Sequence, residues 1–200
     1  MATSVAPNPG RLGCLLCLMT WALHSQAQET PPPAYQWAAH AAGIPSAVLF
    51  AVALQESGAH LRGRLVPWPW TLNIAGAPYH FATRVEACAA LRRALARVPP
   101  TRVDAGLGQV NVGYQAHRFG EPCELLNPYR NLAITATILR EHHGPGEDWL
   151  LAIGRYHRPA GGALAERYQR SVHQHLARVI GPSRVIEQSL LATPRQSSPP

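Results

Sequence analysis

The feature that most constrains the fold is the stretch of residues 48–58, which reads VLFAVALQESG. Its first seven residues are all apolar, and a helix that is apolar on every face is a buried helix. The stretch turns polar at Gln55 and stops at Gly58, a residue typical of helix C-termini. Ser46 lies just before it and can cap the first turn. The sequence therefore predicts a buried helix around which the other elements pack.

One acidic side chain, Glu56, falls on the last turn of this predicted helix. Burial disfavours the charged form of a carboxylate, and so does the partial negative charge at a helix C-terminus. Both effects raise the pKa, which is what a carboxylic acid needs in order to donate a proton near neutral pH. The alternative interpretation is an ordinary polar residue at a helix end.

The first 27 residues have the pattern of a secretory signal peptide. Arg11 supplies a positive charge, residues 12–23 are apolar, and Ser25 and Ala27 are the small residues expected before a cut. The apolar run is short for a membrane span. We expect cleavage after Ala27 and export, with no stable membrane span afterwards. A retained N-terminal anchor is the alternative.

The net charge of +7 comes from eighteen arginines, and the chain has no lysine. The arginines are scattered along the sequence, and only Arg92 and Arg93 are adjacent. No basic stripe forms, so we expect no nucleic-acid partner. A positively charged protein can still be attracted to an anionic polymer such as a cell wall.

Export leaves two cysteines, Cys88 and Cys123. In an oxidising compartment an even pair predicts a disulfide, and two separate buried thiols are the alternative. The histidine pairs at 142–143 and 173/175 are remote from both cysteines in sequence. We therefore expect no metal site.

Local signals set the remaining boundaries. Thr83 and Glu86 form a capping box, and Asn127 followed by Pro128 is a helix start. Helices are expected at residues 35–42, 48–58, 83–98, 127–143, 149–156 and 163–180, a hairpin at 70–74 and 78–81, irregular chain at 60–69, and a glycine-rich loop at 103–114. The prediction is a mostly helical α+β domain at residues 35–182, after a proline-rich linker at 28–34 and before a flexible tail at 183–200.

Four motifs occur in order: ALQESG at 53–58, GLGQVN at 106–111, NPYRNLAITATIL at 127–139 and AIGRYH at 152–157. Together they resemble the soluble lytic transglycosylase family, which has a lysozyme-like fold. WPWTLNIAG at 68–76 and FATRVEACAAL at 81–91 resemble a narrower branch, the exported transglycosylases associated with type IV secretion, conjugation and integrating conjugative elements. The resemblance covers about residues 35–182 and implies a periplasmic protein.

The resemblance assigns roles position by position. Glu56 matches the catalytic acid and Tyr156 the tyrosine whose hydroxyl reaches it. Ser57 matches the serine that follows the acid. His157 stands where the family usually has asparagine beside the tyrosine.

The glycine-rich loop matches the family's sugar-binding loop. Gly106, Gln109 and Asn111 are thereby assigned to the substrate groove. Gly108 replaces the usual methionine, which removes one apolar sugar contact. Asn131 matches the asparagine of the helix behind the site.

The implied substrate is the peptidoglycan glycan strand. The implied reaction breaks the β-1,4 bond from N-acetylmuramic acid to N-acetylglucosamine, with no cofactor, and forms a 1,6-anhydro ring. The nucleophile is tethered, so a single glutamate suffices as acid and base. A lysozyme-type hydrolase needs a second acid, for which Asp104 is the candidate, although an aspartate before a turn usually bonds local backbone. A non-catalytic glycan-binding assembly factor is the third alternative.

Overall fold

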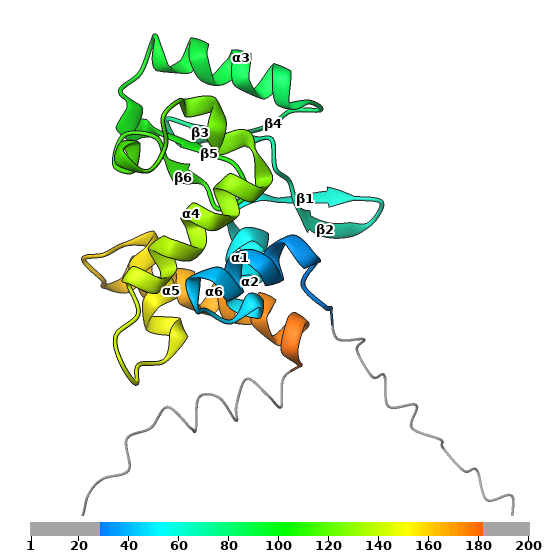
Figure 1. The fold of residues 1–200 in the computed structure, drawn as a ribbon, viewed down its shortest axis with the longest axis vertical. Coiled ribbons are helices and arrows are strands. Elements are labelled where there is room, and N and C mark those ends of the chain that lie inside the picture. The colour runs from blue at the N-terminus through cyan, green and yellow to red at the C-terminus, as the bar shows by residue number, and fades with distance from the viewer. Residues whose placement is uncertain (1–28, 182–200) are drawn as a thin grey trace, which may run out of the picture.

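The computed structural model describes residues 29–181, and these form a mixed α and β fold that is mostly helical (Figure 1). This confirms the predicted mixed α and β, mostly helical character. The predicted signal peptide, its cleavage point and the predicted tail from residue 183 lie outside the described residues. The helices are α1 (Pro33–Ala42), α2 (Ser46–Ser57), α3 (Arg84–Leu95), α4 (Pro128–Glu141), α5 (Trp149–His157) and α6 (Ala163–Ile180), and the strands are β1 (Gly58–Leu61), β2 (Arg64–Pro67), β3 (Thr71–Ile74), β4 (Ala77–His80), β5 (Val103–Ala105) and β6 (Val110–Asn111).

Helix α2 is buried as predicted. Every side chain at residues 48–54 is at most 4% exposed, and α1, α4 and α6 pack around the helix. The predicted cap is wrong: Pro45 occupies the N-cap position, and Ser46 is already the first helical residue. The helix ends at Gly58 as predicted, and only glycine fits there, because a Cβ would overlap the carbonyl oxygen of Leu54 and the side chain of Leu65.

Among residues 29–181, no single helix has the length and apolar character needed to cross a membrane. Helices α1 and α2 together pass by length and composition, but they are bent by 117° at the break between them.

The main sheet has the strand order β4-β3-β5-β6, all antiparallel. The β3–β4 hairpin confirms the prediction for residues 70–81. Two other predictions are wrong. The expected irregular chain at 60–69 contains the β1–β2 hairpin, and the expected loop at 103–114 contains β5 and β6. Both segments have short strands of two to four residues, whose period-2 pattern is too brief to detect against glycine and proline signals.

The main sheet has two different faces. Leu72, Val103 and Ala105 are fully buried and pack with the apolar side of α3. The residues between them in the strands, Asn73 and Asp104, line a cleft on the other face. This alternation follows from the two-residue period of a strand.

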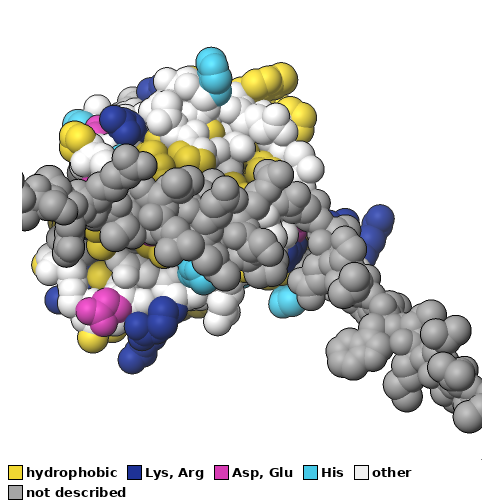
Figure 2. Space-filling model, turned by 90° about the horizontal axis from the view of Figure 1, so that it is seen from below, with side chains coloured by type: hydrophobic (Ala, Val, Ile, Leu, Met, Phe, Trp, Pro, Cys, Tyr) yellow, Lys and Arg dark blue, Asp and Glu magenta, His cyan; other side chains and the backbone are white. Residues whose placement is uncertain are grey.

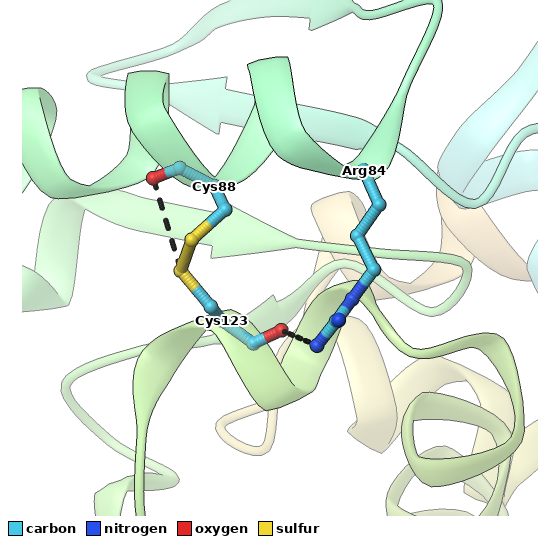
Figure 3. The surroundings of a disulfide bond; sticks show 3 residues. All are labelled: Arg84, Cys88 and Cys123. Atoms are coloured by element: carbon cyan, nitrogen blue, oxygen red, sulfur yellow. Dashed lines mark hydrogen bonds between the residues drawn. A yellow bond between two sulfur atoms is a disulfide. The ribbon is translucent and has the colours of Figure 1, made fainter.

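Helix α3 is fixed to the sheet end of the molecule by the capping box and by a disulfide (Figure 3). Thr83 accepts a hydrogen bond from the Glu86 amide, and the Glu86 carboxylate accepts one from the Thr83 amide. Cys88 and Cys123 are bonded as predicted, with 5.3 Å between their Cα atoms. Arg84 forms a second connection, donating a hydrogen bond of 3.0 Å to the Cys123 carbonyl oxygen. The helix ends at Leu95, three residues before the predicted boundary.

Helix α4 joins the two ends of the molecule. Its side chains Leu132, Ala136 and Leu139 belong to the core around α2, and Ile134 and Ile138 belong to the core between the sheet and α3. Asn127 caps α4 as predicted, accepting hydrogen bonds from the amides of the second and third helical residues. The cleft lies where these two cores meet.

Candidate active site

The cleft has a volume of about 820 Å³ and is bordered by both cores. This size is in the range of ligand-binding sites. One wall is the sheet face that carries Asn73 and Asp104, and the other is formed by the end of α2, by α4 and by α5. Its lining residues are Gln55, Glu56, Gly58, Thr71, Asn73, Pro78, His80, Asp104, Gln109, Val110, Asn111, Tyr114, Gln115, Ile138, His142, Tyr156, His157 and Pro159.

Glu56 lies in this cleft on the last turn of α2. Burial raises the pKa of its carboxyl to about 7, and the negative charge of Asp104 adds to the increase. A hydrogen bond from Tyr168 acts in the opposite direction and limits the increase in pKa. Glu56 is therefore protonated in a large fraction of molecules at neutral pH, which suits a proton donor.

Tyr168 of α6 donates a hydrogen bond to Oε1 of Glu56. Burial and the nearby Glu56 carboxylate raise the pKa of Tyr168 well above its ordinary value, so the hydroxyl remains a donor throughout the physiological range. Among residues 29–181, no donor reaches the other carboxyl oxygen, Oε2. The proton that Glu56 carries can therefore sit on Oε2, in a carboxyl group whose orientation Tyr168 holds.

Tyr168 is the site residue that the sequence analysis missed. Its signal was the apolar stripe of α6, on which it lies with Ala165, Val172 and Leu176. A buried tyrosine needs a partner for its hydroxyl. The stripe indicates that Tyr168 is buried, but its partner lies 112 residues away and is not readable from the pattern.

The prediction that the Tyr156 hydroxyl reaches Glu56 is wrong. This hydroxyl donates instead to the carbonyl oxygen of Gly108, at 2.5 Å. Tyr156 does line the cleft, and burial together with the Glu56 charge raises its pKa. It therefore links α5 to the glycine-rich loop, while the contact to the acid comes from α6.

His157 lines the cleft and stacks on Tyr168, with the ring centroids 4.4 Å apart and the planes 4° from parallel. Burial and the neighbouring Arg158 charge lower its pKa, so the imidazole is neutral at pH 7. The structure thus gives His157 a contact to the tyrosine that holds Glu56, in addition to the predicted place at the substrate groove.

Two predicted substrate residues, Ser57 and Gly106, lie under the cleft instead of lining it. Ser57 is 1% exposed, and its hydroxyl donates to the carbonyl oxygens of Ala53 and Leu107. Gly106 is buried with φ +82, and a Cβ there would overlap the side chain of Asn131. Both residues position the loop, because their own polar atoms face protein and not the cleft.

Gly108 is also explained by packing. A Cβ at this position would overlap the side chain of Thr135 on α4, so a larger residue would point into the helix and not into the cleft. The loss of a sugar contact at position 108 stays a prediction. The Asn131 side chain holds the loop from behind. Its Oδ1 accepts a hydrogen bond from the Gly108 backbone amide at 2.8 Å, and its Nδ2 donates to the backbone carbonyl oxygens of Ala105 and Leu125.

Gln109 and Asn111 line the cleft as predicted. Gln109 has φ +47, and its Nε2 donates to the carbonyl oxygens of Thr71 and Gly106, which leaves its Oε1 as an acceptor for a ligand. Asn111 is more fully occupied. It donates to Asp104 at 2.8 Å and accepts from two backbone amides, so it acts mainly by holding Asp104.

Asp104 differs from its prediction. It lies on β5 opposite Asn73 and Asn111, its hydrogen bond is to the Asn111 side chain, and no local backbone amide binds it. Burial raises its pKa, although the Asn111 hydrogen bond opposes this. The cleft therefore contains a second carboxyl group that interacts electrostatically with Glu56.

No three His, Cys, Asp or Glu side chains in the described part of the chain come together as metal ligands do. Comparison with known proteins gives no relative: no protein-family model, no curated protein and no solved structure matches this chain.

Proposed function

We propose that this protein is a peptidoglycan lytic transglycosylase with a lysozyme-like fold and that it acts in the periplasm. The observation that carries the proposal is Glu56, whose pKa is raised to about 7 in a cleft large enough for sugar rings. The four motifs shared with the transglycosylase family support the same substrate, the glycan strand. The neutral polar side chains of Asn73 and Gln109 suit the acetamido and hydroxyl groups of such a strand.

In the proposed reaction, Glu56 gives its proton to the leaving oxygen O4 of N-acetylglucosamine as the bond from that oxygen to C1 breaks. The 6-hydroxyl of the N-acetylmuramic acid residue then attacks its own C1 and returns its proton to the Glu56 carboxylate. The ring closes without water, and Glu56 ends in its starting protonation state. Tyr168 keeps the carboxyl oriented through both proton transfers.

A lysozyme-type hydrolase is the second candidate, and Asp104 is the observation that favours it. Hydrolysis by a pair of carboxyl groups needs a base or nucleophile in addition to the acid. Asp104 lines the same cleft as Glu56 and is near enough to affect its pKa. In a transglycosylase the same carboxylate would stabilise the positive charge that develops at C1.

The mass of the products distinguishes the two reactions. Mature protein and its Glu56→Gln variant are each incubated with purified sacculi. Products one water lighter than the hydrolysis products, and absent with the variant, support the transglycosylase. Full-mass reducing ends support the hydrolase. Sacculi that bind the protein but give no products support the glycan-binding assembly factor.

The family resemblance also suggests a biological role, local opening of the wall for a type IV secretion or conjugation apparatus. The experiment that tests this role is complementation. A strain whose conjugation depends on this gene should regain transfer with the wild-type chain and not with Glu56→Gln produced at the same level.

A further inference from the structure

Four arginines at the end of α3 and just after it are exposed: Arg92, Arg93, Arg97 and Arg102, here called the α3 arginine cluster. Within residues 29–181, none of their side chains forms an ion pair or a side-chain hydrogen bond. Exposed arginines without such partners also occur elsewhere, at Arg62, Arg158, Arg167 and Arg170. The part-buried Arg118, Arg155 and Arg178 are each paired with a glutamate.

This cluster holds most of the excess charge of the structured part. Residues 29–181 contain fifteen arginines and ten acidic residues, and residues 84–102 alone contain five arginines and one glutamate. At the opposite end of the molecule, seen in Figure 2, the visible arginines stand at separate places. Residues 84–102 therefore carry most of the net positive charge of residues 29–181.

The cluster lies behind one wall of the cleft. Helix α3 covers the sheet face that carries Leu72, whereas Asn73, the next residue, faces the cleft. The disulfide and the Arg84 hydrogen bond fix α3 to this wall. A glycan strand in the cleft and an anionic group at the α3 arginine cluster would thus be held on opposite sides of one sheet.

Helix stability explains only part of this arrangement. Arg92 and Arg93 lie in the last turn, where a positive charge interacts favourably with the helix dipole. Arg97 and Arg102 lie beyond the end of α3 and outside that turn. Four exposed positive charges within residues 92–102 attract ligands of opposite charge.

The surroundings argue against two other kinds of anion site on α3, a phosphate site at the helix N-terminus and a lipid surface. A helix binds phosphate at its N-terminus, but the first turn of α3 carries Glu86, and its amides are capped by Thr83. A helix that adsorbs to lipid needs an exposed apolar face, and in α3 this face, with Ala87 and Leu91, is buried in the core. An arginine can pair with a carboxylate or a phosphate through two parallel hydrogen bonds, and the peptide stems of the proposed substrate supply carboxylates.

We propose that the α3 arginine cluster binds the peptide-stem carboxylates of a neighbouring glycan strand while the cleft holds its own strand. This inference rests on the proposed substrate, the cell wall. It adds a second contact between the protein and the wall. Once one contact has formed, the protein is held near the wall, which raises the effective concentration for forming the other contact.

The test measures retention on sacculi that lack anionic secondary polymers, with all proteins in the Glu56→Gln background so that nothing is digested. The test variant carries Arg92→Gln, Arg93→Gln and Arg97→Gln. The matched control carries Arg62→Gln, Arg167→Gln and Arg170→Gln, which removes three exposed arginines without ion-pair partners from other surfaces. Sacculi whose carboxylates have been converted to amides serve as the second ligand.

We expect the test variant to bind native sacculi about fivefold or more weakly than the parent, and the control to change less than twofold. On amidated sacculi the parent and the test variant should bind alike. Equal losses in test and control variants would overturn the proposal, because binding would then follow net charge. A binding defect of the test variant that persists on amidated sacculi would also overturn the proposal. The same holds if the parent protein binds duplex DNA or anionic vesicles through these arginines more tightly than it binds native sacculi.

This result is separable from that of the proposed function. Retention is measured without catalysis, whereas the product-mass experiment uses active protein. Absence of cleavage products together with cluster-dependent retention would refute the enzyme and keep the binding surface. Anhydro products together with equal retention of all variants would support the enzyme and refute the binding surface.

Discussion

Removal of the Tyr168 hydroxyl should shift the pH dependence of the proposed reaction upward. A general acid works only while it carries its proton, so the rate falls as pH rises through the pKa of Glu56. In the wild-type protein this fall is expected near pH 7, the value to which burial raises the Glu56 pKa. The Tyr168 hydrogen bond stabilises the carboxylate and lowers that pKa, so Tyr168→Phe should move the fall to higher pH.

The size of the shift follows from the charge on the acceptor. A hydrogen bond to a charged group contributes roughly 1.5–3 kcal/mol, and one pKa unit corresponds to about 1.36 kcal/mol. The high-pH limb should therefore move up by roughly one to two units, to between about pH 8 and pH 9. The maximal rate should fall at the same time, because the freed carboxyl group can rotate away from the leaving oxygen.

The assay is the initial rate of sacculus clearing between pH 5 and pH 10 at limiting substrate. Tyr156→Phe is the matched control, since the Tyr156 hydroxyl binds Gly108 and not Glu56. Asp104→Asn should move the limb in the opposite direction, because the Asp104 charge raises the Glu56 pKa. A limb that stays in place in Tyr168→Phe, or that moves more in Tyr156→Phe, would refute this account of the site.

Three further predictions concern stability. The folded-state pKa of Glu56 is raised from 4.5 to about 7, so ionisation of Glu56 destabilises the fold as pH rises through that interval. Glu56→Gln should therefore add up to about 3 kcal/mol to the free energy of unfolding at pH 8 and nothing at pH 4. Thermal melts of both proteins at both pH values measure this difference. Replacing Cys88 and Cys123 by serine removes the bond between positions 35 residues apart and should lower the free energy of unfolding in urea by about 3–4 kcal/mol. Added reductant should lower the stability of the wild type and leave that of the variant unchanged. Gly108→Ala should cost roughly 1–3 kcal/mol through overlap with Thr135, and Thr135→Ala in the same chain should recover part of it; a neutral Gly108→Ala would show that the loop moves freely.

Elements with strong local signals were predictable from the sequence. Each of these signals depends on neighbours within about one helical turn. They are the apolar run of α2, the Thr83 capping box, the Asn127 cap with Pro128 and the apolar stripe along the 18 residues of α6. The short strands β1, β2, β5 and β6 were missed, because two to four residues hold too little of the strand period to be distinguished from loops.

The acid of the candidate site was also predictable, since Glu56 sits at the end of a run whose burial is evident from composition alone. Its partners were not. Tyr156 and Tyr168 lie on successive helices, and only the packing of α6 against α2 decides which hydroxyl reaches Glu56.

The sequence by itself thus predicted the buried helix and the acidic residue at its end, and it favoured a disulfide between Cys88 and Cys123 on the expectation that the signal segment with Cys14 and Cys17 is removed. These depend on hydrophobicity, helix periodicity and the count of cysteines, which are local or compositional properties. The tertiary structure alone decided that Asp104 faces the cleft and that Ser57 and Gly106 lie beneath it. These properties depend on which faces of distant elements meet, and sequence separation carries no information about that contact.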